Sequence, residues 1–284
     1  MRTSRILLGM MCVVMGVGVV GAGGWEDIFN GQDMAGWREN RFAHEPRWEV
    51  KDGVLVGRGG QGYLVTEGEY GDFELEVEVR IWDEGDRRGN SGVYIRCQPH
   101  ENKGAEYPPG YEVQCDHFDQ NNPTGSIYNL GEPGSRAPMP AIRDGEWFTM
   151  RVVAQGNHLR TWVNGKVAVD CTDTKSRYMR GSVLLQMHHR TGVVEFRKVR
   201  IRKLELVEAA CGECLFGMPG NGCDLAVRVG GEGYFVDGVD QDGLGDAHAE
   251  DGICNAVRRA WVAGEVRGGR FEAGYFELGS VVKE

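Results

Sequence analysis

The fold is decided by a strictly alternating stretch, Phe73-Glu74-Leu75-Glu76-Val77-Glu78-Val79. Side chains of a β-strand point to opposite faces in turn, so this stretch predicts a strand with one apolar and one acidic face. Residues 93–97, 111–116 and 184–188 alternate in the same way, and turn signals such as Asn164-Gly165 separate such stretches. About a dozen short strands of this kind favour a two-sheet β-sandwich or jelly roll. The predicted fold class of residues 25–206 is therefore mainly β.

The chain changes character after Glu208. Cysteines cluster there, and residues 224–229, 234–236, 261–266 and 270–278 have strand character. A helix is expected to begin at Asp246, because acidic residues fill its first turns and Arg258-Arg259 lie near its end, as the helix dipole favours. We therefore expect a signal peptide at 1–22, a β-sandwich at 25–206, and a small Cys-rich α+β domain at 208–284 that docks on the sandwich without a flexible linker.

The charge balance of the chain excludes one class of partner. The formal net charge is −10, and no basic stripe with interleaved aromatic residues is present. A net-acidic protein repels the phosphate backbone of nucleic acids. We therefore predict no nucleic-acid partner.

The N-terminus has the layout of a secretory signal. Arg2 and Arg5 precede an uncharged apolar run at residues 6–20, and small residues follow at 21–24. Cleavage after Ala22 fits this layout and predicts an exported protein, periplasmic or extracellular. A membrane anchor is the alternative, but the run is short for a span of roughly 20 residues, so no membrane span is expected after cleavage. A lipoprotein signal is a poor match, because Cys12 sits inside the apolar run.

An ordered series of motifs between Trp25 and Leu206 gives the chain a family resemblance. It opens with Ile28-Phe29-Asn30-Gly31-Gln32-Asp33-Met34-Ala35-Gly36-Trp37 and continues through residues 48–56, 70–75, 89–96, 110–114, 124–128, 145–147, 163–165, 185–188 and 194–197. This series resembles the 3-keto-disaccharide hydrolase family. The resemblance implies a concanavalin-like sandwich that acts on glycosides. One departure is Trp147-Phe148, where family members often carry Trp-Asn.

The last quarter of the chain has a resemblance of its own. Its carriers are Cys211-Gly212-Glu213-Cys214, Cys223-Asp224-Leu225 and residues 245–254. They resemble a small domain of unknown function found in exported bacterial proteins. This resemblance implies a domain boundary and little chemistry.

Alternation sorts the polar side chains of three strands onto one predicted face. If Val113 and Cys115 point into the core, then Glu112, Gln114 and Asp116 point outward. The same parity places Val93, Ile95 and Cys97 inward with Tyr94 and Arg96 outward, and Leu185 and Met187 inward with Gln186 and His188 outward. Candidate sugar-binding residues are therefore Asn90, Tyr94, Arg96, Gln114, Asp116 and Gln186, with Tyr128 or Trp147 stacking on a sugar ring. The alternative is a solvated outer face, which we prefer for Glu74, Glu76 and Glu78.

The chemistry follows from the substrate that the family resemblance implies. A keto group at C3 acidifies the hydrogen on C2, so a base there can expel the group on C1, and water addition completes a net hydrolysis. Glu112 or His188 is the candidate catalytic base, and Arg96 is a candidate to stabilise the enolate. A divalent cation held by some of Glu112, Asp116 and His188 is an alternative electrophile, although no cofactor is certain. A two-carboxylate glycosidase mechanism stays open.

A rival function also follows from the sandwich, because the same fold serves non-catalytic carbohydrate-binding modules. Carbohydrate is the expected partner in both cases. A third hypothesis makes the Cys-rich domain the working part of the protein.

The cysteines permit several states. Cys97 and Cys115 are candidates for a cross-strand disulfide, or are two buried thiols, and Cys171 has no evident partner in its domain. In the last domain, Cys211, Cys214, Cys223, Cys254 and His248 have the ingredients of a metal site. Two disulfides are the alternative in an oxidising compartment.

Overall fold

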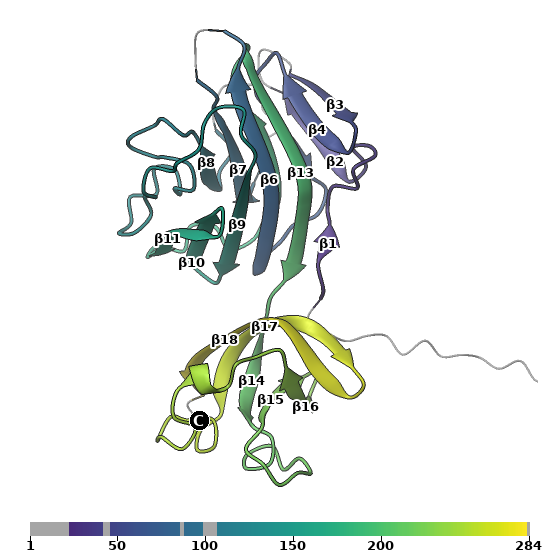
Figure 1. Ribbon diagram of the computed structural model, residues 1–284, viewed down its shortest axis with the longest axis vertical. Helices are drawn as coiled ribbons and strands as arrows, with labels where there is room; N and C mark the ends of the chain where they lie inside the picture. The colour runs from purple at the N-terminus through teal and green to yellow at the C-terminus, as the bar shows by residue number, and fades with distance from the viewer. Residues whose placement is uncertain (1–22, 42–45, 86–87, 99–106, 283–284) are drawn as a thin grey trace, which may run out of the picture.

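The computed structural model describes residues 23–41, 46–85, 88–98 and 107–282 (Figure 1). The predicted signal peptide lies outside these residues. Within the described part of the chain, no helix has the length and apolar character needed to cross a membrane. The described chain is built from strands, with one 3-10 turn (η1, Asp242–Leu244).

Two antiparallel sheets form the first domain. The eight-stranded sheet contains β1 (Glu26–Asp27), β3 (Arg47–Lys51), β4 (Val54–Arg58), β6 (Phe73–Asp83), β9 (Phe148–Gln155), β10 (His158–Val163), β11 (Lys166–Thr172) and β13 (Gly192–Lys203). The five-stranded sheet has the order β2 (Trp37–Arg41), β5 (Gly62–Thr66), β12 (Ser182–Met187), β7 (Ser91–Cys97) and β8 (Tyr111–Cys115). The predicted mainly β sandwich is confirmed.

The two sheets enclose one apolar core. The apolar residues of the alternating stretch in β6, from Phe73 to Val79, are fully buried in it. From the five-stranded sheet, Val93, Val113 and Leu185 join the same cluster. Side chains of opposite parity in either sheet therefore face away from the core.

The second domain is a closed barrel with the order β14 (Glu205–Cys211), β15 (Leu225–Val229), β16 (Glu232–Asp237), β18 (Arg270–Val281) and β17 (Arg258–Arg267). The helix expected from Asp246 is wrong, because this segment forms consecutive turns. The side chain of Asp246 accepts a hydrogen bond from the backbone N–H of His248. The side-chain amide of Asn255 donates hydrogen bonds to the carbonyls of His248 and Ala249. These are backbone groups that a helix would use itself. The domain is therefore β rather than α+β.

The domains are joined directly, since only Leu204 separates β13 from β14 (Figure 1). Val153 and Leu204 of the sandwich pack with Ala263 of the barrel. Beside them, Tyr275 accepts hydrogen bonds from Gln155 (2.8 Å) and Arg160 (2.6 Å). The barrel therefore docks on the eight-stranded sheet through a mixed apolar and polar contact.

Candidate functional site

The five-stranded sheet carries a group of buried polar side chains on the surface that faces away from the core. We call it the Glu112 face, and its members are Tyr63, Tyr94, Glu112, Gln114 and Gln186. Strand pairing brings them together, because Tyr63 lies opposite Gln186 and Tyr94 lies opposite Glu112. Each is less than a tenth exposed. The predicted parity is confirmed for β8, for β12 and for β7 as far as Ile95.

A glycine makes room for the carboxylate. Gly92 pairs with Gln114, and a Cβ atom built on Gly92 would collide with the carboxyl group of Glu112. The side chain of Glu112 therefore lies across β7 at the position where this strand has no side chain. Any residue other than glycine would displace the carboxylate.

Hydroxyl and amide groups surround this carboxylate. The Tyr94 hydroxyl donates a hydrogen bond to Glu112. The Gln186 Nε2 donates to the hydroxyls of Tyr94 and Tyr63, at 3.3 Å each. The rings of these tyrosines meet edge to face, with their centroids 5.2 Å apart. With the amide in this orientation, the buried Gln186 Oε1 has no hydrogen-bond partner among the described residues, so an acceptor is left for a bound hydroxyl.

Burial sets the protonation of this group. Desolvation raises the pKa of Glu112 to about 7, and the hydrogen bond from Tyr94 opposes this shift. Burial also raises the pKa of Tyr63 and of Tyr94 well above the ordinary range. Near neutral pH the face therefore combines a carboxyl group that exchanges its proton with two hydroxyls that keep theirs.

Two tyrosines form the edge of the Glu112 face. Tyr128 is 38% exposed, and its N–H donates to the Glu112 carbonyl at 2.8 Å. Tyr107 is 62% exposed, and its pKa is raised by partial burial and by the nearby Glu112 and Tyr128. Both rings are accessible platforms for a sugar. Tyr128 was predicted from the sequence, whereas Tyr107 and Tyr63 were missed.

Asn90 and Asp116 lie together at the end of the neighbouring strands. The Asn90 amide donates to Asp116 Oδ2 at 3.1 Å. Asp116 Oδ1 accepts the backbone N–H groups of Phe118 and Asp119. The Asp116 carboxylate therefore stabilises a turn, and its role in substrate binding stays a prediction.

The predicted position of Arg96 is wrong. Its side chain is fully buried and donates to the carbonyls of Gly71 (2.7 Å) and Tyr178 (3.2 Å), while its ion pair with Asp72 spans 3.0 Å. Arg96 has a positive φ of 51°, and the pairing of β7 with β12 shifts register at this point. This bulge breaks the alternation on which the prediction rested. Arg96 is therefore a structural residue and does not reach the Glu112 face.

The same bulge explains a second error. Cys97 joins Tyr63 and Tyr94 in a cluster outside the core, whereas Cys115 lies in the core. The two thiols are on opposite faces of one sheet, so the candidate disulfide between Cys97 and Cys115 is wrong and the alternative of two buried thiols holds. Both cysteines are free, as is the buried Cys171.

Trp147 is also separated from the Glu112 face. Arg80 and Arg197 of the eight-stranded sheet lie over its ring, with distances of 4.9 and 4.1 Å to the centroid. Arg80 belongs to the parity of β6 that faces away from the core. The prediction that Trp147 stacks on a sugar beside Glu112 is therefore wrong, because this ring lies on the far side of the sandwich.

His188 follows directly after β12 and is half-buried. Its Nδ1 lies 3.3 Å from Nδ1 of His189, and His189 Nε2 lies 2.5 Å from Asp83 Oδ2. Its catalytic role stays a prediction.

The predicted metal set of Glu112, Asp116 and His188 is not brought together. Within the described ranges, just one group of three or more His, Cys, Asp or Glu side chains is close enough to share an ion. It consists of Cys211, Cys214, Cys223 and Cys254. His248 lies outside this group, with its Nε2 4.0 Å from Cys223 Sγ.

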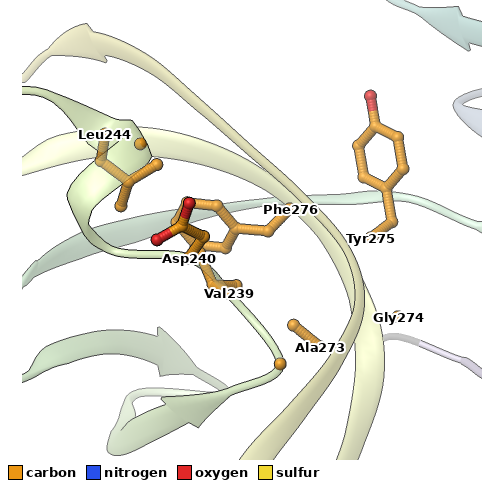
Figure 2. Close-up of a pocket in the computed structure, with 9 residues that line it drawn as sticks. Val239, Asp240, Leu244, Ala273, Gly274, Tyr275 and Phe276 are labelled. Atoms are coloured by element: carbon orange, nitrogen blue, oxygen red, sulfur yellow. The ribbon is translucent and has the colours of Figure 1, made fainter.

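A pocket of about 290 Å³ lies in the barrel domain, on residues far in the sequence from the Glu112 face. It is bounded by the segment 238–244 and by β18, and its one charged lining residue is Asp240. Figure 2 shows Leu244, Val239 and Phe276 gathered at this pocket, while the Tyr275 side chain points away. The titratable lining residues are Asp240 and Tyr275.

Comparisons with known proteins agree with this two-part architecture. Residues 24–202 match the 3-keto-α-glucoside-1,2-lyase-like domain, and residues 205–279 match a family of unknown function. Both resemblances noted in the sequence are confirmed. No curated protein sequence matches the chain.

Solved structures are similar to the sandwich domain. A Parabacteroides distasonis protein named as a candidate glycosyl hydrolase has a TM-score of 0.51 at 24% identity, over 64% of this chain and 94% of that chain. A second structure of that description and organism has a TM-score of 0.52 at 21% identity, over 64% of this chain and all of that chain (100%). These similarities support the sandwich fold.

Proposed function

The chain belongs to the family of 3-keto-α-glucoside-1,2-lyase-like domains, and we propose that it cleaves 3-keto-glycosides by removing the proton on C2 and expelling the group on C1. Membership of this family indicates a role with carbohydrates. Cleavage of 3-keto-glycosides at the Glu112 face is a specific form of that role.

One observation carries the proposal, namely the buried Glu112 carboxyl group with a pKa of about 7. A general base works best when its pKa lies near the operating pH. An ordinary glutamate, with a pKa of 4.5, is a weaker base. No cation among the causes of the Glu112 shift holds the carboxylate in an ion pair. The group is therefore suited to accept and return a proton.

The reaction balances with this residue as the base. Glu112 takes the C2 proton, and the C–H electron pair forms an enolate with its negative charge on the C3 oxygen. The hydroxyls of Tyr94 and Tyr63 stay protonated. Tyr94 donates to the Glu112 carboxylate before the proton transfer, and once Glu112 is protonated both hydroxyls are candidates to donate hydrogen bonds to the C3 oxygen. The enolate then forms the C1–C2 double bond as the C1–O bond breaks. The departing oxygen takes a proton from protonated Glu112, from His188 or from water, and water added across the double bond gives the free keto-sugar.

The test uses a chemically oxidised 3-keto-glucoside and measures the released alcohol by mass spectrometry. Replacing Glu112 by Gln is expected to lower kcat/KM at least about 1000-fold, since an essential base is lost. Glu49→Gln is the matched control, because Glu49 is exposed on the edge strand β3. Equal activity of both variants would exclude Glu112 as the base.

Deuterated water tests the proton abstraction itself. The wild-type protein is expected to introduce deuterium at C2 of the keto-sugar, and the Glu112→Gln variant is not. Release of the alcohol without any exchange at C2, in substrate and in product, would favour the two-carboxylate mechanism instead.

A non-catalytic carbohydrate-binding module is the second candidate, favoured by the exposed rings of Tyr107 and Tyr128. Such a module needs aromatic platforms and no proton transfer. Binding of unoxidised sugars without turnover of any 3-keto-glycoside would support it.

Export is part of the proposal and rests on the sequence of residues 1–22. N-terminal sequencing of protein recovered outside the cytoplasm is expected to begin at Gly23. Material that begins at Met1 would contradict this expectation.

A further inference from the structure

The barrel domain gathers four thiols from three separate segments. Cys211 ends β14 and Cys214 lies in the following turn, Cys223 comes just before β15, and Cys254 lies in the turns that precede β17. Their four Sγ atoms all lie within 4.8 Å of one another. We propose that these cysteines bind one zinc ion as a closed tetrahedral site that holds the barrel domain together.

The mutual distances fit a single metal ion. Four thiolates at about 2.3 Å from zinc in a tetrahedron lie about 3.8 Å apart in every pair. The described thiols approach this arrangement, because all six pairs are close. Two disulfides would require a short Sγ–Sγ distance, about 2.05 Å, in only two of the six pairs. All four are free cysteines here.

The backbone around the thiols is fixed by hydrogen bonds. Cys211 N–H donates to the Ile253 carbonyl at 2.7 Å, and Cys254 N–H donates to the Ala247 carbonyl at 3.0 Å. The Cys214 N–H points at Cys211 Sγ at 3.4 Å. A backbone N–H directed at a cysteine sulfur stabilises a thiolate, as partners of metal ligands do. The three segments are therefore held in place for a shared ion.

His248 fits an outer position rather than a ligand position. Its Nε2 lies 4.0 Å from Cys223 Sγ, and it is not part of the mutually close set. An imidazole N–H at this place can donate to a thiolate that is already bound to metal. Four sulfur ligands without an open position are typical of structural zinc, not catalytic zinc.

The position of the site explains what the ion would stabilise. Residues 212–224 and 245–257 are turns and bends without regular strands. Cys214 and Cys223 are exposed, whereas Cys211 and Cys254 are buried against the barrel. An ion bound to all four would tie both irregular segments to the barrel wall. A domain of this size has a small core and gains from such a cross-link.

Metal analysis of the unaltered protein is the first test. The chain without residues 1–22 is purified without chelator, and zinc is counted by inductively coupled plasma mass spectrometry. We expect one zinc per chain, with four cysteines protected from alkylation until a chelator is added. Cobalt in place of zinc should give the absorption of a tetrahedral cobalt–thiolate centre. Less than a tenth of a zinc per chain, together with a mass showing two disulfides or with four readily alkylated thiols, would overturn the proposal.

Variants then assign the ligands. Cys223→Ser lies at an exposed position and is expected to weaken zinc binding at least about 100-fold. Cys171→Ser is the matched control, because Cys171 is buried in the sandwich and should leave the zinc content unchanged. His248→Ala should keep the zinc but release it faster to a chelator. Full zinc retention in the Cys223 variant, or loss in the Cys171 variant, would contradict the assignment.

Discussion

The carboxylates on the two outer faces of the sandwich have opposite environments. On the eight-stranded sheet, Glu74, Glu76 and Glu78 each pair with arginine or lysine side chains of neighbouring strands. On the five-stranded sheet, Glu112 is buried between tyrosines and has no cation among the groups that shift its pKa. A paired carboxylate stays ionised and contributes to structure, whereas a desolvated carboxylate can exchange protons near neutral pH.

The tryptophans on the outer face of the eight-stranded sheet are paired with cations, as its carboxylates are. The outer face of the eight-stranded sheet stacks Trp82, Trp147 and Trp162 with arginines, at 4.1 to 5.8 Å from side-chain carbon to ring centroid. These rings are engaged within the sheet, and the barrel domain covers its end near Glu74, which is buried. Both outer faces carry acidic and aromatic residues, so this content alone does not identify a functional site. The faces differ in the groups with which each carboxylate pairs.

The largest effect on stability is expected at Arg96, which belongs to neither face. Arg96→Met leaves the carbonyls of Gly71 and Tyr178 and the carboxylate of Asp72 without their donor. We expect a loss of about 4 kcal/mol in the free energy of unfolding, measured by urea denaturation. Arg180→Met is the control, because its ion pair with Glu69 is exposed. A loss below about 1 kcal/mol would show that Arg96 contributes no more than an exposed ion pair, and its structural role would be excluded.

The second prediction concerns Glu112 and stability. The pKa of this carboxyl group is raised by burial from an ordinary value of 4.5 to about 7. The folded state therefore binds more protons than the unfolded state between these values, and stability falls as the pH rises through this range. Glu112→Gln is expected to stabilise the protein by about 3 kcal/mol at pH 8 and to have no effect at pH 4.

Urea unfolding at both pH values checks this expectation. The control is Glu49→Gln, which should shift stability little at either pH. A destabilised Glu112→Gln protein at pH 8 would show that this carboxylate is paired, and the contrast between the two faces would fail.

The third prediction is the pH dependence of turnover. Glu112 must be ionised to act as a base, so kcat/KM for a 3-keto-glucoside is expected to rise up to tenfold per pH unit and level off above about pH 7. Initial rates between pH 5 and 9 measure it. A profile that is already flat at pH 5 would point to an ordinary carboxylate.

The smallest effect is expected on the paired face. Glu76 accepts two hydrogen bonds from Arg200, at 2.7 and 3.0 Å, and both side chains are partly exposed. Glu76→Gln should cost about 0.5 kcal/mol, and less at high salt, because solvent screens such pairs. Urea unfolding at low and high salt measures it. A loss as large as that at Arg96 would mean that the Glu76–Arg200 pair stabilises the fold as strongly as a buried ion pair.

The sequence alone predicted the sandwich and most of the site. Alternation placed Tyr94, Glu112, Gln114 and Gln186 correctly, because β8, most of β12 and the first part of β7 are regular. It failed at Arg96 and Cys97, where a bulge with positive φ reverses the faces. No alternating pattern reports such a bulge.

Other residues depended on contacts distant in the sequence. Tyr63 alternates correctly within β5, but its place beside Gln186 follows from strand order, which periodicity does not contain. Trp147 precedes β9, so parity could not assign its face. The four thiols of the barrel come from three segments, and the spacing of the last two matched no familiar motif.

Gly92 has a consequence for how related sequences are interpreted. Its lack of a side chain is what admits the Glu112 carboxyl group. A relative with alanine at this position could retain every acid, tyrosine and amide of the face and still have its carboxylate pushed aside. An inventory of reactive side chains would then score an impaired protein as complete. If Glu112 is the base as proposed, the residue at position 92 is as important for activity as the carboxylate itself.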